Sequence, residues 1–195
     1  MRDSIWRALS EDLKANTGGG GTVRGIAALF YNPGFCAVAL HRIAARLNSF
    51  GKLGQAFGLL VWRLNVILNG CYFNNRAKIA PGLRLPHPIG VVVGADVSIG
   101  ANVTIYQHVT IGVNENCHAL CPTIHADCVI YAGAVIVGAI SLGPNAVVGA
   151  NSFVRINVPE DSLAVGLPAI IKARLRAPIA ENGALNTSDR PGGLL

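Results

Sequence analysis

The chain has 195 residues, of which 13% are charged, 51% are hydrophobic and 23 are glycine. Soluble domains usually carry about 25% charged residues, so this chain is unusually poor in charge. Its apolar content and its net charge of only +6 exclude a disordered chain. Glycine shows no strict three-residue period, which excludes collagen. The length fits one domain, or one domain with a small appendage.

The charge is mildly basic and unevenly distributed along the chain. Between residues 79 and 158 only five side chains are charged, namely Arg84, Asp96, Glu115, Asp127 and Arg155. Basic residues gather before residue 79 and again at Lys172, Arg174 and Arg176. These clusters are short and aromatic residues make up only 6% of the chain, so a nucleic-acid partner is not expected. A small acidic ligand, such as a phosphorylated cofactor, fits a short basic cluster better.

The five cysteines are odd in number and irregular in spacing, and residues 1–16 lack the apolar core of a secretory signal. Free thiols in a reducing cytoplasm are therefore expected.

The sequence predicts a helical region over residues 1–75. Residues 17–22 contain four consecutive glycines and predict a flexible break, and residues 32–34 predict a stop. Apolar residues then recur at helical spacing over 35–47 and again over 57–68. The apolar stretch 53–68 is too short and too interrupted for a membrane span. A buried helix or a membrane-surface helix is expected there.

From residue 79 onward aliphatic residues recur every six positions. An α-helix, with 3.6 residues per turn, cannot keep such a period on one face. A parallel β-helix can, because each hexapeptide forms one short strand and a turn, and three hexapeptides complete one coil. The predicted fold is thus mainly β, with a small helical region before it. The inward series is Ile79, Leu85, Val93, Ile99, Ile105, Ile111, Ile124, Ile130, Ile136, Leu142, Val148 and Val154.

The predicted β-helix covers residues 76–160. Its repeat is interrupted after Asn116, which predicts an extruded loop over 113–123. Residues 161–176 form a closing segment, and residues 177–195 are expected to be a disordered tail.

Two histidines are candidates for chemistry. His87, between Pro86 and Pro88, and His108 fall on the same side of the predicted coil, one coil apart. Stacked strands are about 4.8 Å apart, so the two imidazoles are expected to be neighbours. An imidazole can take a proton from a hydroxyl, although two solvated surface histidines remain the alternative. His41 is expected at a surface or interface, and His125 in a turn.

Other kinds of site have weaker support. There is no nucleophile elbow, and Cys121 is more easily a pocket wall than a nucleophile. Cys117, His118, Cys121 and His125 match no standard zinc spacing, so no metal is expected.

The chain resembles hexapeptide-repeat acyltransferases of the serine acetyltransferase type, which form left-handed β-helices. The resemblance covers about residues 31–172. Within this family it is similar to the short branch that acts in exopolysaccharide synthesis, such as colanic-acid acetyltransferases, through residues 11–16 and through Cys121-Pro122. The segments that carry the family resemblance are 34–43, 77–79, 85–87, 90–94, 109–112 and 164–169.

The resemblance implies roles for particular residues. His87 is the family's catalytic base, which deprotonates the acceptor hydroxyl for direct attack on acetyl-CoA, and His108 assists it or binds substrate. Lys172 and Arg174 meet the phosphates of the coenzyme. The residues implied to line the coenzyme are Ala132, Gly133, Ala150, Gly166, Leu167 and Pro168.

Departures from the family pattern concern the acceptor. Pro86 and Tyr72 stand where serine acetyltransferases have aspartates, and Cys121 stands where they have a second histidine. These three residues and His118 are expected to bind substrate. A buried ammonium needs a carboxylate partner, so the losses favour a sugar or glycan hydroxyl over serine.

The resulting prediction is a cytoplasmic acetyl-CoA-dependent O-acetyltransferase of exopolysaccharide type. It is expected to be a homotrimer with active sites between subunits, and peripheral contact with the inner face of the membrane is left open. Two alternatives are retained: a serine O-acetyltransferase of cysteine biosynthesis, and a non-catalytic β-helix scaffold.

Overall fold

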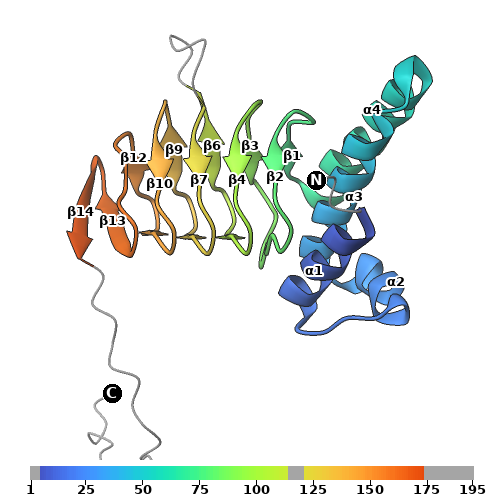
Figure 1. The fold of residues 1–195 in the computed structure, drawn as a ribbon, viewed down its shortest axis with the longest axis horizontal. Helices are drawn as coiled ribbons and strands as arrows, with labels where there is room; N and C mark the ends of the chain where they lie inside the picture. Colours follow the sequence, from blue (N-terminus) through green and yellow to red (C-terminus); the bar gives the residue numbers. More distant parts are fainter. Residues whose placement is uncertain (1–4, 114–120, 174–195) are drawn as a thin grey trace, which may run out of the picture.

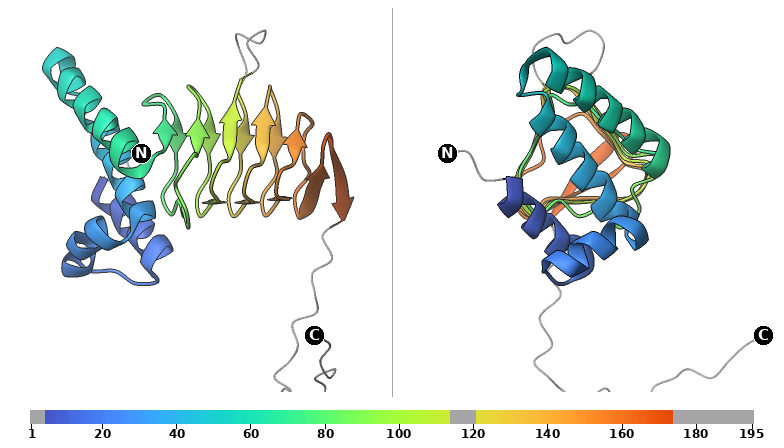
Figure 2. Two further views of the ribbon diagram at one scale, coloured as in Figure 1. Left: turned by 180° about the vertical axis from the view of Figure 1, so that it is seen from behind. Right: turned by 90° about the vertical axis from the view of Figure 1, so that its right-hand side faces the viewer.

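The computed structural model describes residues 5–113 and 121–173, which form a helical cap and a β-helix (Figure 1). The helices lie across one end of the β-helix, as both views in Figure 2 show, and the last strands lie at the other end. The helices are α1 (Ile5–Thr17), α2 (Thr22–Tyr31), α3 (Pro33–Leu47) and α4 (Gly51–Asn69).

Local sequence signals explain several of the helix ends. Asn32 caps α3, because its side-chain oxygen accepts a hydrogen bond from the amide of Phe35 at 2.8 Å, and Pro33 starts the helix. Gly70, with φ of 60°, ends α4. The glycine run separates α1 from α2 as predicted, but α2 itself is an additional helix that the sequence analysis did not assign.

The β-helix consists of short strands in three sheets. Sheet A has the order β1-β3-β6-β9-β12, sheet B β10-β7-β4-β2, and sheet C β14-β13-β11-β8-β5. All neighbours are parallel except β13 and β14, which form an antiparallel hairpin. The bounds are β1 (Tyr72–Phe73), β2 (Lys78–Ile79), β3 (Val92–Val93), β4 (Ser98–Ile99), β5 (Thr104–Ile105), β6 (Thr110–Gly112), β7 (Thr123–Ile124), β8 (Val129–Ile130), β9 (Val135–Val137), β10 (Ser141–Leu142), β11 (Val147–Val148), β12 (Phe153–Val154), β13 (Ser162–Gly166) and β14 (Ala169–Ala173).

The predicted hexapeptide series forms the core of this β-helix. Every member from Leu85 to Val154 is buried, and Ile79 is partly buried against the same core. The chain passes from sheet B to sheet C to sheet A in every coil, so members eighteen residues apart stack directly, as Ile130 does on Val148. The predicted period is therefore confirmed by the parallel register of the strands.

A clasp of buried polar groups joins the helical cap to the first coil. The carboxylate of Asp12, with no exposed surface, accepts hydrogen bonds from Arg42 on α3 and from the amides of Gly82 and Leu83. The side chain of Asn16 accepts from the amide of Leu85 at 3.0 Å and donates to Leu83 at 2.8 Å. The clasp fixes the segment that immediately precedes His87.

Helix α3 buries apolar side chains such as Phe35 and Val38, but α4 turns its apolar face away from the rest of the chain. On α4, Gly54, Gly58, Asn65 and Asn69 face the protein, and the large aliphatic residues of the predicted helical pattern face outward. Of the two alternatives for this stretch, a buried helix is thus not what the single chain shows. No single helix in the described part of the chain is long and apolar enough to cross a membrane; α2 and α3 pass that test only together, across a bend of 108°.

Candidate active site at one corner of the β-helix

His87 lies where the chain turns from sheet C to sheet A, a position that we call the C–A corner (residues 86–90, 106–108, 131–133 and 149–151). Before this turn Arg84 forms a β-bridge to Thr104 of the next coil, and after it Val92 pairs with Thr110 of the next coil. The first coil therefore uses two more residues than the second to pass from sheet C to sheet A. His87 stands on this longer turn, exposed, between two prolines that restrict its backbone.

His108 occupies the same corner one coil further on, as the sequence predicts. Its amide donates to the carbonyl of Ile89 at 3.0 Å, and its φ is 58°, a left-handed conformation. Its imidazole lies directly against Gly90, because a Cβ placed on Gly90 would overlap the Nδ1 atom of His108. The glycine therefore provides the space that the imidazole fills.

The residues implied to line the coenzyme continue along this corner. The amide of Gly133 donates to Gln107 at 3.0 Å, and the amide of Asn151 donates to Ala132 at 2.9 Å, so each coil is tied to the previous one. Ala132 is half-buried and Ala150 is exposed. The corner thus presents a narrow track of small residues that starts at the two histidines.

The β13–β14 hairpin closes the track at the far end of the β-helix. The amide of Gly166 donates to Oγ of Ser152 at 3.2 Å, which places the hairpin turn next to the last coil. Leu167 in that turn is 77% exposed, and its bond to Pro168 is cis. Lys172 is exposed on β14, and Arg174 lies outside the described residues.

The predicted acceptor-binding residues are more dispersed. Pro86 adjoins His87, and Tyr72 is 40% exposed on β1, in sheet A, where its ring meets the edge of Trp62 at 5.3 Å between centroids. Cys121 lies where the chain turns from sheet A to sheet B, and its thiol donates to the carbonyl of Ala95 at 3.2 Å. His118 lies outside the described residues. Within one chain, Cys121 and His87 are therefore at different corners.

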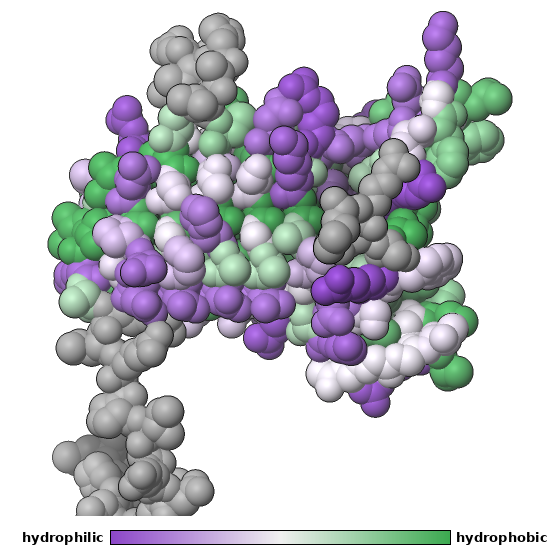
Figure 3. Space-filling view, viewed as in Figure 1, coloured by the Kyte–Doolittle hydropathy of each residue, from purple (hydrophilic) through white to green (hydrophobic). Residues whose placement is uncertain are grey.

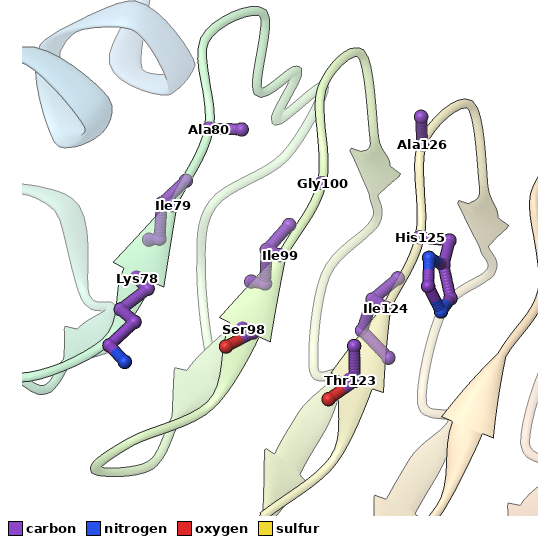
Figure 4. Close-up of a pocket in the computed structure, with 10 residues that line it drawn as sticks. All are labelled: Lys78, Ile79, Ala80, Ser98, Ile99, Gly100, Thr123, Ile124, His125 and Ala126. Atoms are coloured by element: carbon purple, nitrogen blue, oxygen red, sulfur yellow. The ribbon is translucent and has the colours of Figure 1, made fainter. Parts of the chain in front are cut away.

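A shallow hollow of about 490 Å³ lies on sheet B, away from the C–A corner (Figure 4). Lys78, Ser98 and Thr123 occupy equivalent positions on its three strands, with His125 on the turn beyond β7. A second hollow of about 750 Å³ lies between α1, α3 and the first coil. Neither contains a residue of the small-residue track, so the C–A corner remains the candidate active site.

Buried titratable groups serve the core rather than the chemistry. His41 was expected at a surface or interface, and it lies buried between α3 and the first strand of sheet A rather than at the surface. It is 4% exposed, its ring is 5.5 Å from that of Phe73, and burial followed by the charge of Arg42 lowers its pKa to about 4. The helix face that carries His41 packs onto the first strand of sheet A, which the helical period alone does not reveal.

The buried cysteines are also unreactive. Burial raises the pKa of the Cys71 thiol to about 12 and that of Cys128 to about 11, so both stay protonated at neutral pH. The four cysteines in the described part of the chain are all free. Among residues 5–113 and 121–173, no three histidine, cysteine or acidic side chains are grouped so as to hold a metal ion.

The fold and the corner together define the class: a parallel β-helix of hexapeptide repeats, with a helical cap and a histidine at the head of a track of small residues. Comparison with known proteins gives the family. The chain is 33% identical over 159 residues to a serine acetyltransferase of Bacillus licheniformis, covering 81% of this chain and 72% of that relative. It belongs to the serine acetyltransferase family. No family model matches it.

Further relatives agree with this assignment. A serine acetyltransferase of Synechococcus elongatus is 33% identical over 145 residues, which are 74% of this chain and 59% of that relative. The crystal structure of serine acetyltransferase from Neisseria gonorrhoeae superposes with a TM-score of 0.78 at 30% identity, over 91% of this chain and 70% of that one. The chain thus spans little more than half of some curated relatives that it matches.

These relatives correct the acceptor prediction. The preference for a sugar or glycan hydroxyl, and the likeness to the exopolysaccharide branch, are not supported; the relatives and structures above are all serine acetyltransferases. The preference for a sugar failed because the absence of aspartates at Pro86 and Tyr72 shows only that those two positions cannot bind an ammonium through a carboxylate. It does not show that the ammonium is absent, since neutral oxygen and nitrogen acceptors can also bind one.

Proposed function

We propose that the chain is an acetyl-CoA-dependent serine O-acetyltransferase whose active site is the C–A corner. The observation that carries the proposal is the alignment of His87 and His108 with Ala132, Gly133 and Ala150 along one corner, ending at the β13–β14 hairpin. This arrangement supports a base at one end of a track for an extended coenzyme. Relatives crystallised in complex with serine, such as the soybean and gonococcal enzymes, support the acceptor.

In the proposed reaction His87 acts as the general base. Its imidazole takes the proton of the serine hydroxyl while the oxygen attacks the thioester carbon of acetyl-CoA. The tetrahedral intermediate collapses with cleavage of the carbon–sulfur bond, and the leaving thiolate recovers the proton from the imidazolium. His108, one coil away, assists by contacting the acceptor or the developing oxyanion.

The track suits the coenzyme because its side chains are short. Alanine at 132 and 150 lets a pantetheine arm lie against the backbone, where amides and carbonyls of the corner are within reach, whereas the space beside Gly133 is filled by the Asn151 side chain. Lys172, exposed beyond the hairpin, supplies a cation for the phosphates, and Arg174 is proposed to add a second. Gly166, Leu167 and Pro168 form the end wall.

The outer faces of the sheets support a trimer of left-handed β-helices with sites between subunits. Apart from Thr110, sheet A presents apolar side chains in register at Val92, Val135 and Phe153. Apart from Arg84 and Thr104 in the first two coils, sheet C presents Val129, Val147 and Leu163. The corresponding positions of sheet B are all polar, at Lys78, Ser98, Thr123 and Ser141. The C–A corner therefore lies between the two apolar faces, where neighbouring copies would pack. Cys121 and His118 would then reach His87 from a neighbouring copy.

The serine ammonium has no acidic partner at the corner itself. Residues 84–95, 104–113, 129–137 and 147–155, which make up sheets C and A and their shared corner, contain no aspartate or glutamate. We therefore assign the ammonium to neutral acceptors, with the hydroxyl of Tyr72 and the imidazole of His108 as candidates and Pro86 as a wall. Weaker serine affinity than in enzymes with carboxylates follows.

The proposal is tested by release of the free thiol of CoA from acetyl-CoA with L-serine as acceptor. His87→Ala is expected to lower kcat about 10²–10⁴-fold, the usual contribution of a general base. His125→Ala is the matched control, because this exposed histidine lies on the turn beyond β7, away from the C–A corner, and the rate of the variant should stay within about twofold of wild type. An absence of serine-dependent thiol release, or a His87→Ala variant as active as wild type, overturns the proposal. The scaffold alternative further predicts no thermal shift with acetyl-CoA.

A further inference from the structure

Helix α4 turns its apolar side outward. Its buried positions are small or polar, and Gly54 and Gly58 let it lie so close to α3 that an added Cβ would overlap the Leu47 carbonyl or the Asn48 side chain. The outward side chains form what we call the α4 apolar face. Its members, each 45% or more exposed, are Leu53, Phe57, Leu60, Leu64, Ile67 and Leu68.

Helix α2 adds a second set of exposed apolar residues at the same end of the molecule. Val23 is 84% exposed and Phe30 is 88% exposed, and Ile26 and Tyr31 are 59% and 62% exposed. In Figure 3 hydrophobic side chains gather at the right-hand edge, over α4 above and α2 below. Soluble monomers rarely expose so many large apolar residues together, so this end of the molecule is an interaction surface.

The charge around this surface has one sign. The sequence contains no aspartate or glutamate between Asp12 and Asp96, although the same stretch holds nine lysines and arginines. Arg42 is neutralised by Asp12, and Arg76 pairs with Asp96. Four cations on α2, α3 and α4 have no ion pair with any residue in the described part of the chain. They are Arg24, Arg46, Lys52 and Arg63.

These observations distinguish between two possible partners for this surface, a second copy of the chain and a lipid membrane. Packing the surface against a second copy of itself would cover the apolar side chains but would bring like charges together, with no carboxylate of this stretch to pair them. An anionic lipid surface meets both requirements, because acyl chains accept the apolar face and headgroups accept the cations. We propose that α4, with α2 beside it, lies flat on an anionic membrane. The helix, 19 residues long, would run parallel to the bilayer.

The test is vesicle flotation with the full chain. Vesicles of phosphatidylcholine alone are compared with vesicles that contain about 30% phosphatidylglycerol, at low and high salt. The protein is expected to float with the anionic vesicles at least tenfold better than with the neutral ones, and high salt should reduce this preference.

Two double variants separate the apolar and the electrostatic contributions to membrane binding, and a third variant serves as the control. Leu60→Ser/Leu64→Ser, both exposed, should lose at least tenfold in binding to anionic vesicles while keeping the wild-type unfolding midpoint. Lys52→Gln/Arg63→Gln should lower binding to anionic vesicles and leave the neutral ones unchanged. Ile156→Ser, an exposed apolar residue after β12, is the matched control and should float as wild type does.

Sedimentation of the same proteins without vesicles distinguishes a second copy. An unchanged mass for Leu60→Ser/Leu64→Ser, together with lost flotation, supports membrane docking. No flotation of the wild type, or a lower assembly mass for the leucine variant with unaltered flotation, overturns the proposal and assigns the surface to contacts between copies. The acetyl-transfer assay in solution should not respond to these variants, so the outcome is independent of the proposed catalytic function.

Discussion

Removal of one buried carboxylate should detach the helical cap from the β-helix. Asp12 accepts hydrogen bonds from Nε and Nη2 of Arg42 at 2.5 and 3.0 Å, and from the amides of Gly82 and Leu83 at 2.9 and 3.1 Å. In Asp12→Ala the guanidinium, only 11% exposed, would retain only the carbonyls of Ile79 and Ala80 as partners. Its positive charge would then be buried without compensation.

The magnitude follows from that loss. Breaking a buried ion pair by removing one partner costs about 3–5 kcal/mol. This is a large part of the free energy of unfolding of a domain, which is typically about 5–15 kcal/mol. Glu11 is the matched control, because its carboxylate forms an exposed ion pair with Lys14 at 3.1 Å. Glu11→Ala should cost less than about 1 kcal/mol.

Equilibrium urea unfolding, followed by circular dichroism and tryptophan fluorescence at one protomer concentration, measures both variants. Trp62 is a suitable reporter, since its indole donates to the Phe73 carbonyl at 2.9 Å, where α4 meets the first coil. Replacing both partners, as in Asp12→Ala/Arg42→Met, should recover part of the loss, because no unpaired charge remains. If Asp12→Ala costs no more than Glu11→Ala, the clasp does not hold the cap and the reasoning fails.

Two further predictions concern pH and the C–A corner. Because the pKa of His41 is lowered to about 4 in the folded state from 6.5, the unfolded state binds more protons below pH 6.5. The contribution of neutral His41 to the free energy of unfolding is complete above that pH and is lost as pH falls toward 4. The free energy of unfolding should fall by about 2 kcal/mol between pH 7 and 5. If its pH dependence is the same for wild type and His41→Leu, this prediction is wrong. Gly90→Ala should cost about 1–3 kcal/mol, from its φ of 72° and from displacement of His108. Gly112→Ala, whose Cβ meets nothing within 4 Å, should cost less than half as much by thermal unfolding; equal costs would argue against the close packing at this corner.

The β-helix was predictable from sequence because its core is periodic. One inward residue per hexapeptide, such as Ile105 or Ile130, both fills the interior and sets the register, so the same signal repeats many times. The shared corner of His87 and His108 follows from the same count. The roles of these residues were not readable from the period, and came only from resemblance.

The helical cap was less predictable, for a physical reason. A helical apolar pattern shows that a helix has two sides but not which side meets the protein. On α4 the informative residues are Gly54 and Gly58, whose lack of a Cβ permits close contact with α3. The burial of His41 was missed for the same reason. Helix α2, which lies between the predicted break at 17–22 and the predicted stop at 32–34, was not assigned from the sequence.

The C–A corner also has a consequence for how the β-helix can change in length. Its left-handed positions alternate along the axis: Gly90, His108, Gly133, Asn151. Each bulky member fills the space left by the glycine one coil before it, so His108 covers Gly90 and Asn151 covers Gly133. Deleting or duplicating a single coil would set two bulky residues, or two glycines, against each other. At this corner the unit of insertion is two coils, although the hexapeptide period alone would permit one.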